Sequence, residues 1–187
     1  DEATSASSGP IVLADLADNA GVGAPSDSTF ILQSILQREL SNVATGFYWD
    51  PIAVRFCIEA GENAQFTLRI GGKVSEGSGD PVDLPITVRR IVPEAFQSFG
   101  TARQHMGSGV WITTGNDLDI FLNTIRTQTF HPDAFEQFGI ELAQKKIVVV
   151  KSTQHFYAGF EPIAESVLYV AAPGAISMNF SDLPFRK

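Results

Sequence analysis

The sequence is poor in cysteine and in basic residues, and it lacks a long apolar run. Its 187 residues include one cysteine, Cys57, which excludes the disulfide framework of a small secreted domain and favours a reducing, cytoplasmic setting. Lys and Arg number 13 against 21 Asp and Glu, so the net charge of -8 argues against nucleic acid as a partner. No apolar stretch approaches the roughly 18 residues that a membrane helix requires, and we expect no membrane partner.

Several catalytic motifs are also absent. There is no His-Glu-x-x-His, no His-x-His and no pair of cysteines, so we expect no complete zinc site and no metal ligands in this chain. A nucleotide-binding P-loop needs Lys before Ser or Thr, whereas residues 26–29 read Ser-Asp-Ser-Thr, and no Gly-x-Ser-x-Gly elbow is present. Of the histidines, we expect His131 to cap a helix beginning at Pro132, and His105 to lie in a mobile loop at 100–109.

Apolar strands alternate with helical segments at both ends of the sequence. Residues 11–14 and 147–150 are short continuous apolar runs typical of buried strands, and 167–170 predicts a third strand. Helices are predicted at 31–40, 51–60, 132–138 and from 161 onward. In the second of these, Asp50 is placed to cap, Pro51 takes the first position, Gly61 ends the helix, and the buried side comprises Ile52, Val54, Phe56 and Ile58.

The middle of the sequence has the alternation of an antiparallel sheet. Strands are predicted at 66–70, 82–88, 110–113 and 118–122, and Pro85 indicates an edge strand or a bulge. With 44% hydrophobic residues the chain can build a sizeable core. The predicted fold class is α/β, a mixed sheet with flanking helices and an antiparallel β-meander insertion in a single domain. The two buried strands are expected to lie close together.

The first residues are polar and have no basic or apolar region of a signal peptide. We interpret residues 1–9 as the remnant of a linker and residues 10–187 as the domain itself.

The loop that follows the first buried strand is the most informative segment. Residues 15–28 are rich in Asp, Gly, Pro and Ser and lead into a helix, so they lie where open α/β sheets bind ligands. Free backbone N–H groups at the helix start favour an anion, and Gly21 and Gly23 allow a substrate backbone to approach. The alternative is that Asp27 or Ser28 caps the helix and the glycines form a turn.

A second set of polar residues follows the strand at 147–150. Lys151 and His155 are expected to project toward the same edge as the first loop and to meet Asp18 or Asp27. The alternative is a buried Lys–Asp pair and a histidine hydrogen-bonded to the backbone.

These segments carry a resemblance to a known family. The loop from Asp18-Asn19 to Thr29 resembles the Ala-Asp-Asn-Pro-Gly-Gly-Gly-Ala-Pro-Gly-Asp-Ser/Thr-Thr signature of MlrC-like (microcystinase C) metallopeptidases. Further motifs resemble the C-terminal domain of that family in order, over nearly the whole sequence: Trp49-Asp50-Pro51, residues 70–73, 130–139, Lys151-Ser152, His155-Phe156, 160–164, 172–174 and Leu183-Pro184. Ala20 stands where the family has Pro, and Val22 and Ser26 stand where it has Gly. We expect Val22 to restrict a position of positive φ.

The resemblance implies a zinc-dependent hydrolase of peptide bonds in which an N-terminal domain, absent from this chain, holds Zn²⁺. This chain would then form a wall of the cleft, with its own N-terminal domain and a peptide or amide substrate as partners; homo-oligomer formation is left open. The supporting catalytic candidates are Asp18, Asn19, Lys151 and His155. The substrate-binding candidates are Asp18, Asn19, Gly21, Gly23, Asp27 and Thr29. The alternative is a noncatalytic domain that binds a small anion or metabolite, or one that dimerises.

Overall fold

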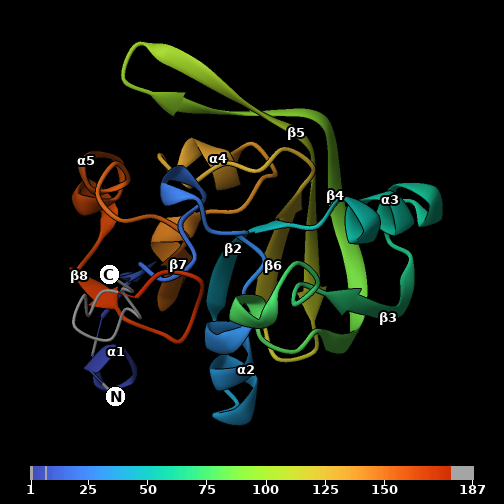
Figure 1. Ribbon diagram of the computed structural model, residues 1–187, viewed down its shortest axis with the longest axis horizontal. Helices are drawn as coiled ribbons and strands as arrows, with labels where there is room; N and C mark the ends of the chain where they lie inside the picture. The colour runs from blue at the N-terminus through green and yellow to red at the C-terminus, as the bar shows by residue number, and fades with distance from the viewer. Residues whose placement is uncertain (1, 7, 178–187) are drawn as a thin grey trace, which may run out of the picture.

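The computed structural model describes residues 2–6 and 8–177, which form one eight-stranded mixed sheet with helices on both faces (Figure 1). The predicted fold class is confirmed. The strands are β1 (Ile11–Asp15), β2 (Val43–Trp49), β3 (Gln65–Ile70), β4 (Val82–Phe99), β5 (Ala102–Thr114), β6 (Leu118–Asn123), β7 (Ile147–Val150) and β8 (Ser166–Val170). The α-helices are α1 (Glu2–Ser5), α2 (Phe30–Gln37), α3 (Pro51–Ala60), α4 (Asp133–Glu136) and α5 (Tyr157–Phe160). Short 3₁₀ turns are η1 (Ala20–Val22), η2 (Glu76–Ser78), η3 (Leu142–Gln144) and η4 (Glu161–Ile163).

The strand order β3-β4-β5-β6-β2-β7-β1-β8 divides the sheet into two halves. From β6 to β8 all neighbours pair in parallel, whereas β3, β4, β5 and β6 pair antiparallel, as expected for an inserted meander. The two buried strands are direct neighbours, with Ile11 opposite Ile147 and Ala14 opposite Val150. The carboxyl ends of β1 and β7 therefore meet, and the polar segments that follow them share one edge.

Side-chain alternation sends successive residues of β1 into two separate cores. Ile11 packs in a cluster that includes Leu32 and Ile35 of α2 and Val54 of α3. Val12 and Ala14 pack on the other face, in an aromatic cluster built from Phe47, Phe121, Phe135, Phe138, Phe156 and Phe160. The helices α1, α2 and α3 thus serve one core, and α4 and α5 serve the other.

The meander contains a long hairpin that the sequence did not predict. β4 and β5 remain paired out to Phe99 and Ala102, and the hairpin extends beyond the sheet and lies over α4 (Figure 1). The expectation of a mobile loop at 100–109 is wrong, because residues 102–109 belong to β5 and His105 packs against the ring of Phe96 at 4.8 Å. Side chains from α4 and the residue after it hold the hairpin down: Asp133 accepts from the backbone N–H of Ser98, and Gln137 bonds the backbone of Phe96.

The helix α3 starts and ends as predicted but buries a different side. The Asp50 carboxylate accepts from the N–H of Ala53, Pro51 is the first helical residue, and Gly61 closes the helix. Its buried residues are Ala53, Val54 and Cys57, whereas Ile52, Phe56 and Ile58 are exposed. The prediction was therefore right for Val54 and wrong for the three larger side chains. Small residues let this helix approach the sheet closely, which turns the larger ones outward.

Smaller predictions have mixed outcomes. The interpretation of Pro85 as a sign of an edge strand or a bulge is wrong, because β4 lies between β3 and β5 and its register shifts come only after Val88. Pro85 lies opposite Thr67 of β3, in the stretch of β4 before the pairing with β5 begins at Thr87, where it leaves no bond to β5 unmade. The segment interpreted as a linker contains α1, in which Ala3 is buried against the core, and its linker role stays a prediction. Within the described residues no helix is long and apolar enough to cross a membrane.

Candidate functional site

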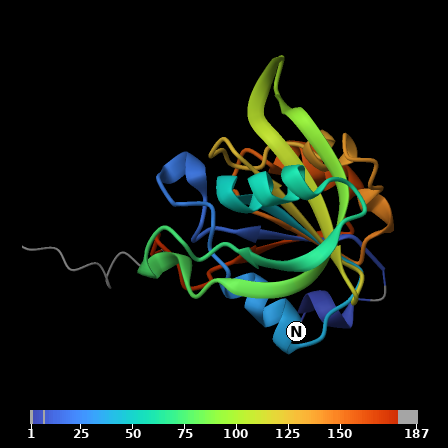
Figure 2. The same ribbon diagram turned by 90° about the vertical axis from the view of Figure 1, so that its right-hand side faces the viewer.

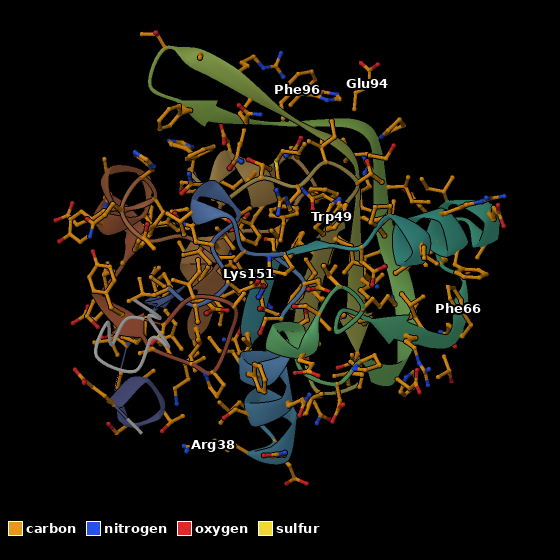
Figure 3. All side chains as sticks on the ribbon, viewed as in Figure 1. Arg38, Trp49, Phe66, Glu94, Phe96 and Lys151 are labelled. Carbon is orange, nitrogen blue, oxygen red and sulfur yellow. The ribbon has the colours of Figure 1, made fainter. Side chains whose placement is uncertain are left out.

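The site lies at the carboxyl edge of the parallel strands and is organised around a buried lysine. Lys151 follows β7, and its ammonium group donates to Asp18 Oδ2 at 2.9 Å, to Asp15 Oδ2 at 3.2 Å and to the carbonyl of Ser28 at 3.0 Å. All three ionisable side chains are buried, and Figure 3 shows Lys151 in the interior beside the ends of the central strands. The prediction that Lys151 meets Asp18 is confirmed in the form of the alternative, a buried Lys–Asp pair.

The charge state of this cluster is decided by two opposing effects, burial and the attraction between Lys151 and the two carboxylates. Burial works to lower the pKa of Lys151, but the nearby carboxylates of Asp15 and Asp18 outweigh burial and raise the pKa above its ordinary value. Burial also raises the pKa of Asp15, against the opposing attraction of Lys151. Asp15 Oδ1 is the one buried side-chain nitrogen or oxygen atom in the described residues that has no hydrogen-bond partner. The lysine therefore stays charged and is shared between two carboxyl groups.

Asp18 fixes the far side of the loop after β1. Its Oδ1 accepts from the N–H of Ser26 at 2.8 Å, and its Oδ2 accepts from the N–H of Ser28 at 2.7 Å. With Lys151 on Oδ2 as well, both carboxylate oxygens are used inside the protein. Asp18 therefore works as an anchor for the loop.

Asn19 shapes the exposed rim of the loop, residues 20–23. Its side-chain oxygen accepts from the N–H of Gly21 at 2.8 Å, and its side-chain nitrogen donates to Thr153 at 2.9 Å. The N–H groups of residues 21–24 all bond within the loop. Gly23 has φ 101, a conformation that glycine adopts without strain. The rim is exposed, but its backbone donors are already occupied.

Asp27 and Thr29 tie the loop to the segment after β3. Asp27 Oδ2 accepts from the N–H of Lys73 at 2.7 Å, and Asp27 Oδ1 accepts from the hydroxyl of Ser78. Thr29 donates to the carbonyl of Asp80 at 2.6 Å. Neither Asp27 nor Ser28 caps α2, whose N-cap is Thr29 with no side-chain cap bond, so the capping alternative is wrong. A second anchor lies close by, since Asp50 accepts from the N–H of Gly71 at 2.9 Å and from the ammonium of Lys73.

His155 does not join this cluster. Its ring is exposed and makes an edge contact with Phe99 at the tip of the β4–β5 hairpin, 5.2 Å between centroids, and a looser contact with Phe130. Within the described residues no hydrogen bond or ion pair joins His155 to Lys151, Asp18 or Asp27. The expectation that it meets these carboxylates is wrong, and so is the alternative of a backbone hydrogen bond.

Gln128 and Arg126, which belong to no sequence motif, lie beside the rim. Gln128 is 9% exposed; its Oε1 accepts from the hydroxyl of Ser152 at 3.1 Å, and its Nε2 lies 2.3 Å from where a Cβ on Gly21 would be. Arg126 is exposed and donates to the carbonyls of Gly23 and Ala24, at 3.4 and 3.1 Å. Both come from the segment after β6, a strand parallel to β2, and that topology is the signal that could have placed them at this edge.

The comparisons with known proteins agree with this architecture. The family model described as "MlrC C-terminus" matches residues 13–187. The chain belongs to the MlrC C-terminal family. Microcystinase C of Sphingomonas sp is 38% identical over 170 residues, which are 91% of this chain and 33% of that protein. A crystal structure from Mesorhizobium sp. BNC1, named "Putative metallopeptidase", superimposes with a TM-score of 0.84 at 26% identity, covering 98% of this chain and 37% of that one. The chain thus spans about a third of the length of these relatives.

The departures of this MlrC C-terminal domain from the family signature have different structural settings. Ser26 has φ 65 and is buried, so a side chain occupies a left-handed position where the family has glycine. Val22 is not among the residues with positive φ, and its side chain is 58% exposed. The expectation that Val22 restricts a position of positive φ is therefore wrong, and the strained position is Ser26.

The described residues of this MlrC domain do not fit a zinc ion. No three His, Cys, Asp or Glu side chains within residues 2–6 and 8–177 lie close enough together to hold a metal. The buried carboxylates of Asp15 and Asp18 already share the Lys151 ammonium group. A cation added there would meet a fixed positive charge.

Proposed function

We propose that this MlrC C-terminal domain forms one wall of the substrate cleft of a zinc-dependent metallopeptidase, and that an N-terminal domain of the same protein holds the zinc. The substrate class is peptides or amides. The family membership and the metallopeptidase name of the structural neighbour support the proposal. The single buried cysteine supports a cytoplasmic setting as part of it.

One observation carries the proposal: buried side chains fix the loop after β1, and its exposed rim lies beside two side chains that can donate hydrogen bonds. Asp18, Lys151 and Asp27 hold the loop from below, so the rim at 20–23 has a fixed position. Gln128 and Arg126 flank that rim, and the amide Nε2 of Gln128 makes no hydrogen bond with another described residue. A peptide presents carbonyl oxygens and carboxylates, which amide and guanidinium groups bind well.

The predicted site residues have different roles in this proposal. Asp18 and Lys151 act as anchors of the loop, and Asp27 and Thr29 connect it to the segment after β3. Asn19 sets the turn of the rim, while Gly21 and Gly23 have no side chain, so that a substrate backbone can approach these two positions closely. His155, against Phe99, is a contact of the hairpin.

The decisive test is zinc content and hydrolysis of a panel of small peptides, on this chain and on a full-length parent protein side by side. We expect stoichiometric zinc and cleavage in the parent alone. Zinc and cleavage in this chain by itself would contradict the divided arrangement. A parent that binds neither zinc nor peptide, and whose domain is stabilised by a small anion, would favour the noncatalytic alternative.

Variants in the parent separate the residue roles. Asn19→Ala should lower turnover, because the turn that presents the rim loses its side-chain hydrogen bond, whereas His155→Ala should leave turnover nearly unchanged. Unchanged turnover for Asn19→Ala would remove the loop from the substrate-binding wall.

A further inference from the structure

The outer face of α3 has an unusual composition for a solvent-exposed helix. Ile52 is 62% exposed and Phe56 is 57% exposed, and they are four residues apart, so they lie on one side of the helix. The opposite side, with Ala53, Val54 and Cys57, is buried in the core. Figure 2 views α3 from outside the sheet, with no other element of the described chain in front of it. Two large apolar side chains are thus left uncovered by this domain.

These side chains border a depression on the surface of α3. It has a volume of about 440 Å³ and is lined by Pro51, Ile52, Arg55, Phe56 and Glu59. Arg55 and Glu59 form an exposed ion pair at 2.8 Å alongside it. An apolar centre with paired charges at its border is the usual composition of a protein–protein contact.

The residues that lead into α3 are bonded to the loop of the candidate site and to the end of β6. Asp50, which caps α3, bonds its backbone N–H to the carbonyl of Asn123, and Trp49 bonds its N–H to the carbonyl of Ser26 in the site loop. At the same edge Val22 and Ile125 are also exposed. The start of α3 is therefore attached to the same carboxyl edge of the sheet that carries the candidate site.

The length of the relatives indicates what covers the α3 face. The family model that covers residues 13–187 is named for a C-terminus, and this chain corresponds to 33% and 37% of the length of the two relatives. Most of their polypeptide therefore precedes the matched region. We propose that the α3 face, defined by Ile52, Arg55, Phe56 and Glu59, is the docking surface for that preceding domain. The inference rests on the proposed function and identifies the surface that brings the two walls together.

Hydroxyl-radical footprinting of a full-length parent tests the contact without needing activity. We expect oxidation of Phe56 to be several-fold slower than that of Tyr157 and Tyr169, which have similar exposure in this domain, at 44% and 46%. Oxidation of Phe56 at the rate of these tyrosines, after correction for intrinsic reactivity, would overturn the proposal.

A double variant of the parent tests the energetics of the same contact. Ile52→Ser with Phe56→Ser should loosen the docked arrangement, seen as a larger radius of gyration and regained labelling of the surrounding surface. Ile58→Ser is the matched control, since Ile58 is on α3 and 43% exposed but does not line the depression. Equal behaviour of the double variant and the control would contradict the inference.

Two further outcomes are distinguishable. Phe56 protection that disappears on dilution, together with a concentration-dependent mass in light scattering, would assign the face to a second copy of the protein and overturn the proposal. A parent that lacks zinc and hydrolysis but protects Phe56 would contradict the proposed function while supporting the docking surface.

Discussion

Lys151 Nζ lies 2.9 Å from Asp18 Oδ2, and this buried ion pair joins the end of β7 to the loop after β1. A buried pair of this kind holds a geometry because neither partner has water to turn to. The loop that carries the candidate rim is thereby fixed to the centre of the parallel sheet.

Removal of the lysine charge should be strongly destabilising. Lys151→Met leaves Asp15 and Asp18 buried without a cation, and we expect the free energy of unfolding to fall by about 3–5 kcal/mol, measured by urea denaturation. The control is Arg69→Met, which removes an exposed ion pair with Asp83 and should leave the free energy of unfolding almost unchanged, because water screens the two charges. Adding Asp15→Asn to Lys151→Met should recover part of the loss. A loss below about 1 kcal/mol for Lys151→Met would show that the cluster is dispensable.

Alkaline pH should weaken the fold through Cys57. Burial, with a smaller effect of Asp50, raises the pKa of this thiol from 9.0 to about 12. The folded state then keeps a proton that the unfolded state loses, so this part of the stability is complete below pH 9 and falls between pH 9 and about 12. In Cys57→Ala that slope should be reduced, when unfolding is measured across this range. A thiol reagent should react with native Cys57 only as fast as the protein unfolds; rapid labelling at pH 8 would contradict the burial.

The two departures from the glycine signature should respond differently to restoration of glycine. Ser26→Gly relieves a left-handed φ of 65, and this gain of roughly 1 kcal/mol offsets the added freedom of the unfolded chain, so stability should change little. Val22→Gly relieves nothing and should cost about 0.5–1 kcal/mol. Ser26→Val should cost more than either. Differential scanning calorimetry distinguishes the three, and a stabilising Val22→Gly would show that the rim is strained at that position.

Gly21 should matter through Gln128. A Cβ at position 21 would lie 2.3 Å from Gln128 Nε2, so Gly21→Ala must displace the amide from Ser152. In a full-length parent we expect Gly21→Ala and Gln128→Ala each to lower turnover, by up to roughly 10²-fold if the amide binds the reacting carbonyl. Their combination should be no worse than either alone.

Gly23→Ala is the control for that pair. Nothing lies within 4 Å of a Cβ there, but its φ of 101 makes alanine strained, so stability should fall while Gln128 stays in place. Additive effects of Gly21→Ala and Gln128→Ala would show that the two residues act independently.

The central features of the fold were predictable because each depended on a local pattern. The apolar runs of β1 and β7 indicated their burial, and Asp50-Pro51 with Gly61 indicated the ends of α3. The position of Lys151 directly after a buried strand indicated contact with Asp18 or Asp27, and in the structure the partner of the two is Asp18.

The remaining features depended on contacts distant in the sequence. Apart from Phe99, the tip of the β4–β5 hairpin has small and polar residues, and its support comes from Asp133 and Gln137, more than thirty residues away. The buried side of α3 could not be read from its apolar residues, since apolar residues occupy both sides of the helix and close packing selected the small ones. Gln128 belongs to no motif, and only the fold brings its amide to Gly21.

The segment after β3 is attached twice, through Asp27 and through Asp50. These two buried carboxylates hold the edge of the sheet, and the exposed rim at 20–23 takes no part in the attachment. Substitution of either carboxylate should disturb two loops at once, whereas residues 20–22 make few contacts with the rest of the domain. Substitutions at residues 20–22 are therefore expected to disturb the fold less than substitutions of Asp27 or Asp50. If the proposed role of the rim holds, substitutions at residues 20–22 can alter what the site binds while the hydrogen bonds of Asp27 and Asp50 stay intact.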